Sequence, residues 1–181
     1  SLHDALPISQ LLIMERNGFP EETYYTFSYS PIPDADGLPA GIFCANTDDT
    51  QRVISERQLL LLRELASRAA EARNVGEACE RSAEALATDP QDLPFAMIYL
   101  IDPEEQVARL AATSGIDRHH SGVKPQLALD GSEVWPIADV LAGRDGVLVQ
   151  NLKSLFDLDF PSGGWRQAPQ QIGRASCRER V

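Results

Sequence analysis

The stretch NVGEACERSAEALATDPQDLPFAMIYLIDPEEQVARLAATSG, residues 74–115, decides the fold class of this chain. Its first part predicts a helix that begins at Asn74, because Asn74 and Glu77 have the spacing of an N-terminal capping box. Pro90 ends the helical pattern. We expect one apolar face on this helix, made of Val75, Ala78, Cys79, Ser82 and Leu86.

The second part of the stretch has the pattern of two strands. A fully apolar run follows Pro94, and residues 102–105 then make a turn into a second strand over Val107–Ser114. Strands joined by so short a turn pair antiparallel. A helix followed by this meander predicts an α+β fold with an antiparallel sheet.

A long helix is predicted immediately before this stretch. Residues 53–73 contain no glycine or proline and are rich in leucine, alanine, glutamate and arginine. Their apolar side chains form two neighbouring stripes, with the spacings of three, four and seven residues that are typical of helix–helix seams. The first stripe is Ile54, Leu61, Leu65 and Ala72, and the second is Leu59, Leu62, Ala66 and Ala69.

This helix is predicted to be a connecting, signalling helix that pairs in parallel with its copy in a second chain. The candidate dimer seam consists of Leu61, Leu62, Leu65 and Ala69. Two stripes indicate either that one faces the partner while the other packs on a domain, or that two rotational registers are close in energy. The alternative is that the helix docks on the sheet of its own chain, without a dimer.

The residues before the long helix predict a β-hairpin. Alternate residues over 25–29 are aromatic, as in a strand with one apolar face. We expect Pro31 and Pro33 to end this strand, the sequence DADG at 34–37 to make the turn, and a second strand to cover Ala40–Ala45. Two strands alone are marginally stable in water, so this hairpin needs partners outside the given sequence.

The pattern weakens beyond Gly115. We expect a polar loop over residues 117–124, a short helix over Pro136–Ala142 that Gly143 closes, and a further strand over Val147–Asn151.

Charge and composition argue against several classes of function. The formal net charge of −11 is opposite to the basic patch that a nucleic-acid partner requires. The longest purely apolar run, Leu59–Leu62, is far shorter than the roughly 20 residues that cross a bilayer. Cys44, Cys79 and Cys177 are widely spaced, which fits a reducing, cytoplasmic compartment. We interpret these cysteines as small buried hydrophobes.

Both ends of the chain match a translated sequencing adapter. The oligonucleotide TCCCTACACGACGCTCTTCCGATC translates to SLHDALPI, residues 1–8. Its reverse complement, read from the second base, translates to IGRASCR, residues 172–178. The hypothesis is that residues 1–8 and 172–181 are adapter artefacts that contribute nothing to folding.

Two longer stretches resemble known families. NGFPEETYYTFSYSPIPDADGLPAGIFCANTDDTQRVISERQL, residues 17–59, resembles the C-terminal end of a bacterial PAS domain with its PAC portion. RNVGEACERSAEALATDPQDLPFAMIYLIDPEEQVARLAATSGI, residues 73–116, resembles the opening helix and strands of a GAF domain. The resemblance implies an incomplete PAS hairpin over 9–50, a signalling helix over 51–73 and the N-terminal part of a GAF domain over 74–171.

Such modules lie upstream of histidine kinase cores, so the resemblance implies a sensory and signal-relay role in a bacterial two-component system. It also implies an output domain in the parent protein and allows an unidentified small ligand. Two rivals stay open, namely the sensor half of a transcriptional or stress-response regulator and a remnant of another catalytic protein. The region itself is expected not to be an enzyme, because His119 and His120 lie in a loop and not in a phosphoacceptor helix.

Other reactive side chains are assigned structural roles. His119 and His120 lack the spaced ligands of a metal site, so we expect an exposed loop and no metal. Cys79 lies on an apolar helix face without a neighbouring histidine, so it is expected to pack and not to carry a chromophore. The FPSGGW sequence at 160–165 lacks a GK[ST] motif and is expected to be a linker turn. No cofactor is expected. The acidic residues of the N-terminal half are expected to be solvated or to cap turns, namely Glu21, Glu22, Asp34, Asp36, Asp48 and Asp49.

Overall fold

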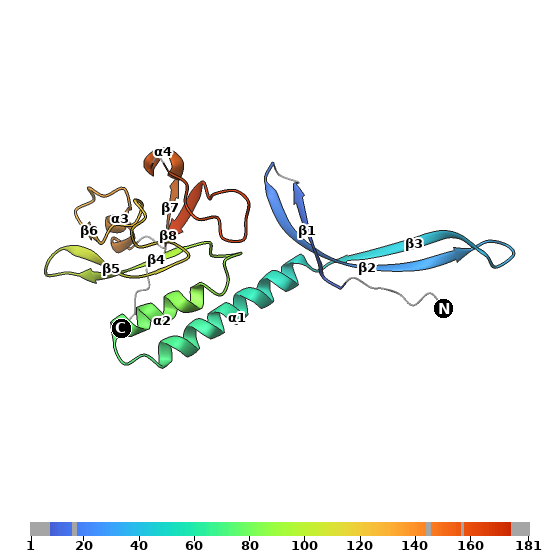
Figure 1. Cartoon of the computed structure of the whole chain (residues 1–181), viewed down its shortest axis with the longest axis horizontal. Coiled ribbons are helices and arrows are strands. Elements are labelled where there is room, and N and C mark those ends of the chain that lie inside the picture. Colours follow the sequence, from blue (N-terminus) through green and yellow to red (C-terminus); the bar gives the residue numbers. More distant parts are fainter. Residues whose placement is uncertain (1–7, 16–17, 144–145, 157, 175–181) are drawn as a thin grey trace. The chain divides into compact units, whose positions relative to one another are not determined.

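The computed structural model describes residues 8–15, 18–143, 146–156 and 158–174 (Figure 1). The chain divides into two compact units, residues 1–60 and residues 61–181. The boundary falls inside helix α1, Thr50–Ala70. Both units combine helix with antiparallel sheet, so the predicted α+β fold class is confirmed.

The first unit contains a three-stranded antiparallel sheet in the order β1-β2-β3. Its strands are β1 (Gln10–Glu15), β2 (Pro20–Pro33) and β3 (Pro39–Asp48). The β2–β3 hairpin was predicted, and Gly37 has a positive φ of 81° in its turn, as expected for the DADG sequence. Strand β1 was not predicted. It pairs with the first six residues of β2, from Pro20 to Tyr25.

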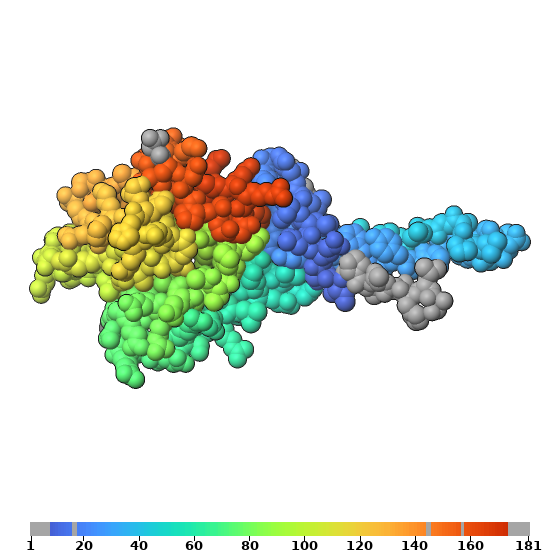
Figure 2. All heavy atoms as spheres, in the orientation of Figure 1, coloured from blue at the N-terminus to red at the C-terminus, as the bar shows by residue number. Residues whose placement is uncertain are grey.

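The prediction that Pro31 and Pro33 end the strand is confirmed at Pro33 and was wrong at Pro31. Pro31 lies opposite Ile42 in the ladder, and β2 ends only at Pro33. The reason is the limited extent of β1, which leaves one edge of β2 unpaired by any described strand from Thr26 onward. A proline is tolerated where its missing N–H would point away from the neighbouring strand. Figure 2 shows this outer part of the hairpin as a thin layer of atoms.

Helix α1 begins directly after β3. The Asp48 carboxylate accepts a hydrogen bond from the Thr50 N–H at 3.0 Å, which satisfies one of the unpaired donors of the first turn. The helix ends at Ala70, three residues before the predicted end. Residues 71–73 instead form a turn that leads into the cap of the next helix.

The second unit opens with helix α2, Val75–Leu86. The predicted cap is confirmed, because the Asn74 side chain accepts a hydrogen bond from the Glu77 N–H at 2.9 Å. The Glu77 carboxylate reaches back to the N–H of Arg73, at 2.9 Å. The bond from the Arg73 N–H, together with the Arg81 guanidinium, holds the pKa of Glu77 below its ordinary value. The predicted face is wrong at Val75, which is exposed.

The sheet of the second unit has the order β4-β5-β6, with all pairs antiparallel. Its strands are β4 (Ala96–Asp102), β5 (Val107–Ser114) and β6 (Gln126–Ala128). The predicted bounds of β5 are confirmed. Strand β6 was not predicted, because its three residues pair with β5 across a long loop.

Different side chains pack on the two faces of this sheet. On one face Cys79 and Ala83 of α2 pack on Ala112, with Ile98 beside them. The other face carries the larger core, which is rich in aromatic side chains. Its buried members are Phe95, Ala108, Ile116, Val123, Leu127, Trp135, Ile137, Val149, Leu152 and Phe160.

This larger core is closed by short elements. They are α3 (Ile137–Leu141), β7 (Val147–Gln150), α4 (Leu152–Phe156) and β8 (Gln171–Arg174). The predicted bounds of helix α3 and strand β7 differ from the observed ones by at most one residue at each end. Gly143 follows α3 with a positive φ of 96°. Helix α4 and strand β8 were not predicted.

Strand β8 corrects one expectation about the C-terminal segment. It pairs antiparallel with β7, and Ile172 packs against the larger core. The expectation that residues 172–181 contribute nothing to folding is therefore not met at Ile172. Burial of an isoleucine side chain against an apolar core is energetically favourable whatever the origin of the residue. Residues 1–7 and 175–181, and with them His3 and Cys177, lie outside the described residues.

Candidate functional site

The two apolar stripes of α1 lie in different environments. The first stripe is buried or half-buried at each of its positions, Ile54, Leu61, Leu65 and Ala72, the last just beyond the helix end. The second stripe is exposed at all four of its positions, Leu59, Leu62, Ala66 and Ala69. We call these four residues the outer stripe.

The predicted dimer seam is divided between these environments. Leu61 is only 7% exposed and Leu65 is half-buried, so both are largely covered within the chain. Leu62 is 62% exposed, and Ala69 is exposed beside it on the outer stripe. A surface that could meet a second chain therefore keeps Leu62 and Ala69, and takes Leu59 and Ala66 in place of the other two.

Helix α2 explains why one side of α1 is covered in the second unit. Figure 1 shows α2 running antiparallel beside the C-terminal half of α1. Arg68 of α1 pairs with Glu84 of α2 at 3.4 Å, and Arg81 of α2 pairs with Glu71 at 2.9 Å. These half-exposed pairs are weak individually. They fix which side of α1 meets α2 and leave the outer stripe uncovered.

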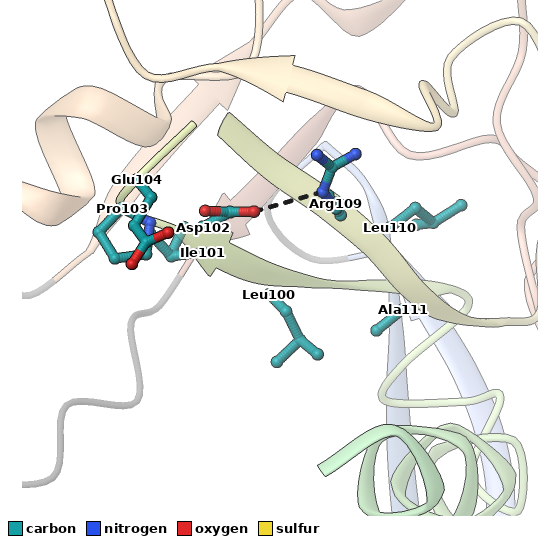
Figure 3. Close-up of a pocket in the computed structure, with 8 residues that line it drawn as sticks. All are labelled: Leu100, Ile101, Asp102, Pro103, Glu104, Arg109, Leu110 and Ala111. Carbon is teal, nitrogen blue, oxygen red and sulfur yellow. Dashed lines mark ion pairs between the residues drawn. The ribbon is translucent and has the colours of Figure 1, made fainter. Parts of the chain in front are cut away.

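An open hollow of about 410 Å³ lies at the far end of the β4–β5 hairpin (Figure 3). Figure 3 shows Leu100 and Ala111 pointing away from the Asp102–Arg109 ion pair, whose Oδ2 and Nε atoms are 3.6 Å apart. Arg109 also pairs with Glu105 and with Gln126. Its charge is thus engaged inside the chain, and the hollow offers a ligand only a shallow apolar surface. Its lining is Leu100, Ile101, Asp102, Pro103, Glu104, Arg109, Leu110 and Ala111.

The adjacent histidines differ from each other. His119 is exposed, as predicted. His120 was predicted to be exposed but is half-buried, with its ring centroid 5.0 Å from that of Phe160. Its Nδ1 accepts a hydrogen bond from the Gly122 N–H at 3.1 Å. Within the described residues, no group of three His, Cys, Asp or Glu side chains is arranged to hold a metal ion.

The described cysteines also differ. Cys79 is buried, as predicted, and its burial raises the pKa of the thiol. Cys44 was interpreted as buried but is exposed. It lies opposite Tyr29 on the outer part of the hairpin, which no third described strand supports. A raised pKa is the opposite of what marks a nucleophilic cysteine, so Cys79 has a packing role.

The FPSGGW sequence was expected to be a linker turn but is part of the core. Phe160 is buried, and the Trp165 indole N–H donates a hydrogen bond to the Gln91 carbonyl at 2.8 Å. Gly163 has a φ of 59° and lies so close to the Pro90 carbonyl that a Cβ would clash with it. The two glycines and the tryptophan in this order were the sequence signal for a tightly packed loop.

The acidic side chains of the N-terminal half lie in different environments. Asp34 caps its turn as expected, accepting hydrogen bonds from the N–H groups of Asp36 and Leu38. Glu22 was expected to be solvated but is buried against Arg57. Among the described helices, none combines the length and the apolar composition that spanning a membrane requires.

The comparisons with known proteins give one distant likeness. No protein-family model matches this chain, and no curated protein matches it. Among solved structures, it is similar to a mutant of the chromophore-binding domain of Stigmatella aurantiaca bacteriophytochrome in the Pr state. The identity is 12% and the TM-score is 0.41. The likeness covers 94% of this chain and 48% of that one, so this chain spans about half the length of that structure.

Proposed function

We propose that this chain is a sensory input and signal-relay region of a bacterial two-component protein. In this proposal the first unit is the end of a PAS-type domain, α1 is the signalling helix, and the second unit is the first part of a GAF-type domain. A histidine kinase core would follow in the parent protein, in the cytoplasm. The region itself relays a signal and does not catalyse a reaction.

One observation carries the proposal, namely that α1 belongs to both compact units and keeps an apolar stripe exposed. Its first turns are bound to β2 in the first unit, through Arg57 and Glu22. Its last turns are bound to α2 in the second unit, through Arg68 and Glu84. A continuous helix held at both ends transmits a displacement from one unit to the other, which is what a relay requires.

The proposed occupant of the outer stripe is the same stripe of a second copy, in parallel. Spacings of three, four and three residues from Leu59 to Ala69 are those of coiled-coil core positions. In a parallel pair Gln58 would face Arg63 of the partner, and Leu65 would face Ala70, so no like charges meet. One heptad earlier, Arg52 would meet its own copy. The seam therefore begins at Leu59.

Sedimentation velocity over a concentration series tests this proposal. The change is Leu62→Glu, which adds a charge at a position that is exposed in the single chain and buried only in the pair. The matched control is Leu60→Glu, the same change at an equally exposed leucine on the other side of the helix from the stripe. We expect the wild type and the control to dimerise and Leu62→Glu to stay monomeric.

Cysteine cross-linking tests the orientation of the pair. In a background without the natural cysteines, a parallel pair brings Leu62→Cys next to its own copy, whereas Ser67→Cys lies on the opposite side of the helix. We expect a disulfide-linked dimer for the first variant and not for the second. A wild-type chain that remains monomeric at high concentration would contradict the dimer, and equal cross-linking at both positions would contradict the seam.

A further inference from the structure

Helix α1 is attached to the sheet of the first unit at two separate points. The first point is the start of the helix. There the Thr50 hydroxyl oxygen accepts a hydrogen bond from the Tyr24 N–H at 2.9 Å, and the Asp49 N–H donates to the Tyr24 carbonyl at 2.8 Å. The Asp49 carboxylate also accepts from the Thr26 hydroxyl at 2.5 Å. These bonds fix the position of the helix end on β2, but a single point leaves the helix free to swing and roll.

The second point is two turns further along the helix. The Arg57 guanidinium binds the Glu22 carboxylate with two bonds, Nη1–Oε1 at 2.5 Å and Nη2–Oε2 at 3.2 Å. The Glu22 side chain is 5% exposed and the Arg57 side chain 23%. A bidentate pair of this kind fixes the orientation of both groups as well as their distance.

The neighbouring tyrosine extends this contact. Glu22 and Tyr24 are two residues apart on β2 and therefore lie on the same face of the strand. Burial and a hydrogen bond to Glu22 raise the pKa of the Tyr24 hydroxyl, which places that hydroxyl beside the ion pair. The helix start and the Arg57 contact thus converge on three alternate residues of β2, Glu22, Tyr24 and Thr26.

A buried pair has two energetically distinct states. Joined, its charges compensate each other, whereas separation leaves a carboxylate without its partner in a site closed to water. An intermediate tilt of the helix that keeps half of the contact is disfavoured for the same reason. The exposed Arg52–Glu56 pair of the same helix lacks this property, because its side chains are 51% and 61% exposed and water replaces either partner.

We propose that Glu22 and Arg57 form a latch that sets the direction in which α1 leaves the β1–β2–β3 sheet, and that opening it is the step by which a change in the sheet reaches the helix. This inference rests on the proposed relay function and adds the pair through which the relay acts. Both are positioning residues, since they act through the helix. The closed latch holds α1 in one direction, and the open latch allows a range of directions.

The test measures this direction inside a single chain. Nitroxide labels at Ser28→Cys of β2 and Gln58→Cys of α1, both exposed, report the distance between sheet and helix. Cys44, Cys79 and Cys177 are replaced beforehand, and labelled chains are diluted into unlabelled ones so that only distances within one chain contribute. We expect a narrow distance distribution with the wild-type pair and one about twofold broader with Glu22→Gln, because the carboxamide cannot compensate the guanidinium charge.

Two further variants separate direction from stability. Arg52→Gln opens the exposed pair and should leave the distribution narrow. The exchanged pair, Glu22→Arg with Arg57→Glu, should restore a narrow distribution, even if Glu22→Gln alone fails to fold. A distribution that stays narrow in folded Glu22→Gln, or stays broad in the exchanged pair, overturns the latch. Failure of the dimer in sedimentation would leave these distances unchanged, so the two proposals fail separately.

Discussion

Replacing Phe160 by alanine should remove the centre of the aromatic core in the second unit. The Phe160 ring is stacked on Phe95 with centroids 5.2 Å apart, and it meets Phe156 edge to face at 5.2 Å. It also meets His120 at 5.0 Å and Trp135 at 6.1 Å. Four aromatic neighbours around one ring mean that the surroundings cannot collapse fully into the space that alanine leaves.

The expected loss of unfolding free energy is about 4 kcal/mol. Truncation of a buried phenylalanine to alanine costs about 3–5 kcal/mol. Each well-placed aromatic pair contributes about 0.5–1.5 kcal/mol beyond the burial of its surface, which favours the upper part of that range. The matched control is Leu155→Ala in the adjacent helix α4, where the side chain is exposed. That change should cost under about 1 kcal/mol.

Urea unfolding followed by tryptophan fluorescence measures this loss in the correct unit. The chain has two tryptophans, Trp135 and Trp165, and both lie in the second unit. The urea concentration at the unfolding midpoint should be lower for Phe160→Ala than for the wild type, while the dependence of the unfolding free energy on urea concentration is unchanged. A loss below about 1.5 kcal/mol would refute the reasoning, because it is less than the usual range for a core phenylalanine. The loop around residues 160–165 would then not be part of the core.

Two further predictions concern the second unit. Gly163→Ala should lower the melting temperature more than Gly37→Ala does. Both glycines have a positive φ, but only at Gly163 would an added Cβ clash with the backbone. Equal decreases in melting temperature would contradict the close packing at Gly163. Glu77 has a pKa lowered by the Arg73 N–H and by Arg81, so its contribution to stability is present above its unfolded pKa of about 4.3 and is lost as the pH falls through the lower folded value. The Glu77→Gln variant should therefore have a lower melting temperature than the wild type at pH 7 and the same melting temperature at acid pH. A difference in melting temperature that stays constant over this pH range would contradict the linkage.

Local patterns predicted the elements that depend on local chemistry. The cap at Asn74 and the bounds of β5 were both read from neighbouring residues, and both are confirmed. Both stripes of α1 were also visible. Which stripe faces outward could not be predicted, because the answer depends on the side at which α2 packs, and α2 follows after a turn whose direction the spacing does not encode.

Several of the errors share a physical cause, which is contact between distant segments. Strands β1 and β6 are short, and each exists only through its pairing with another strand. His120 was assigned to open solvent because its packing partner, Phe160, lies 40 residues away in the chain. Glu22 was expected to be solvated because its partner Arg57 is on another element. Burial of this kind follows from tertiary structure, which composition and periodicity do not report.

The unequal lengths of β1 and β2 have a consequence for self-association. From Thr26 to Pro33 the outer edge of β2 is paired with no described strand, yet Pro31 and Pro33 interrupt its row of N–H donors. Such an edge is a poor template for an incoming strand. Strand β3 has no proline between Ala40 and Asp48, so its outer edge presents an uninterrupted row of donors and acceptors. An intermolecular sheet grown from this hairpin would therefore extend from β3 alone, and a lysine or proline placed on that edge would be the effective protection against aggregation.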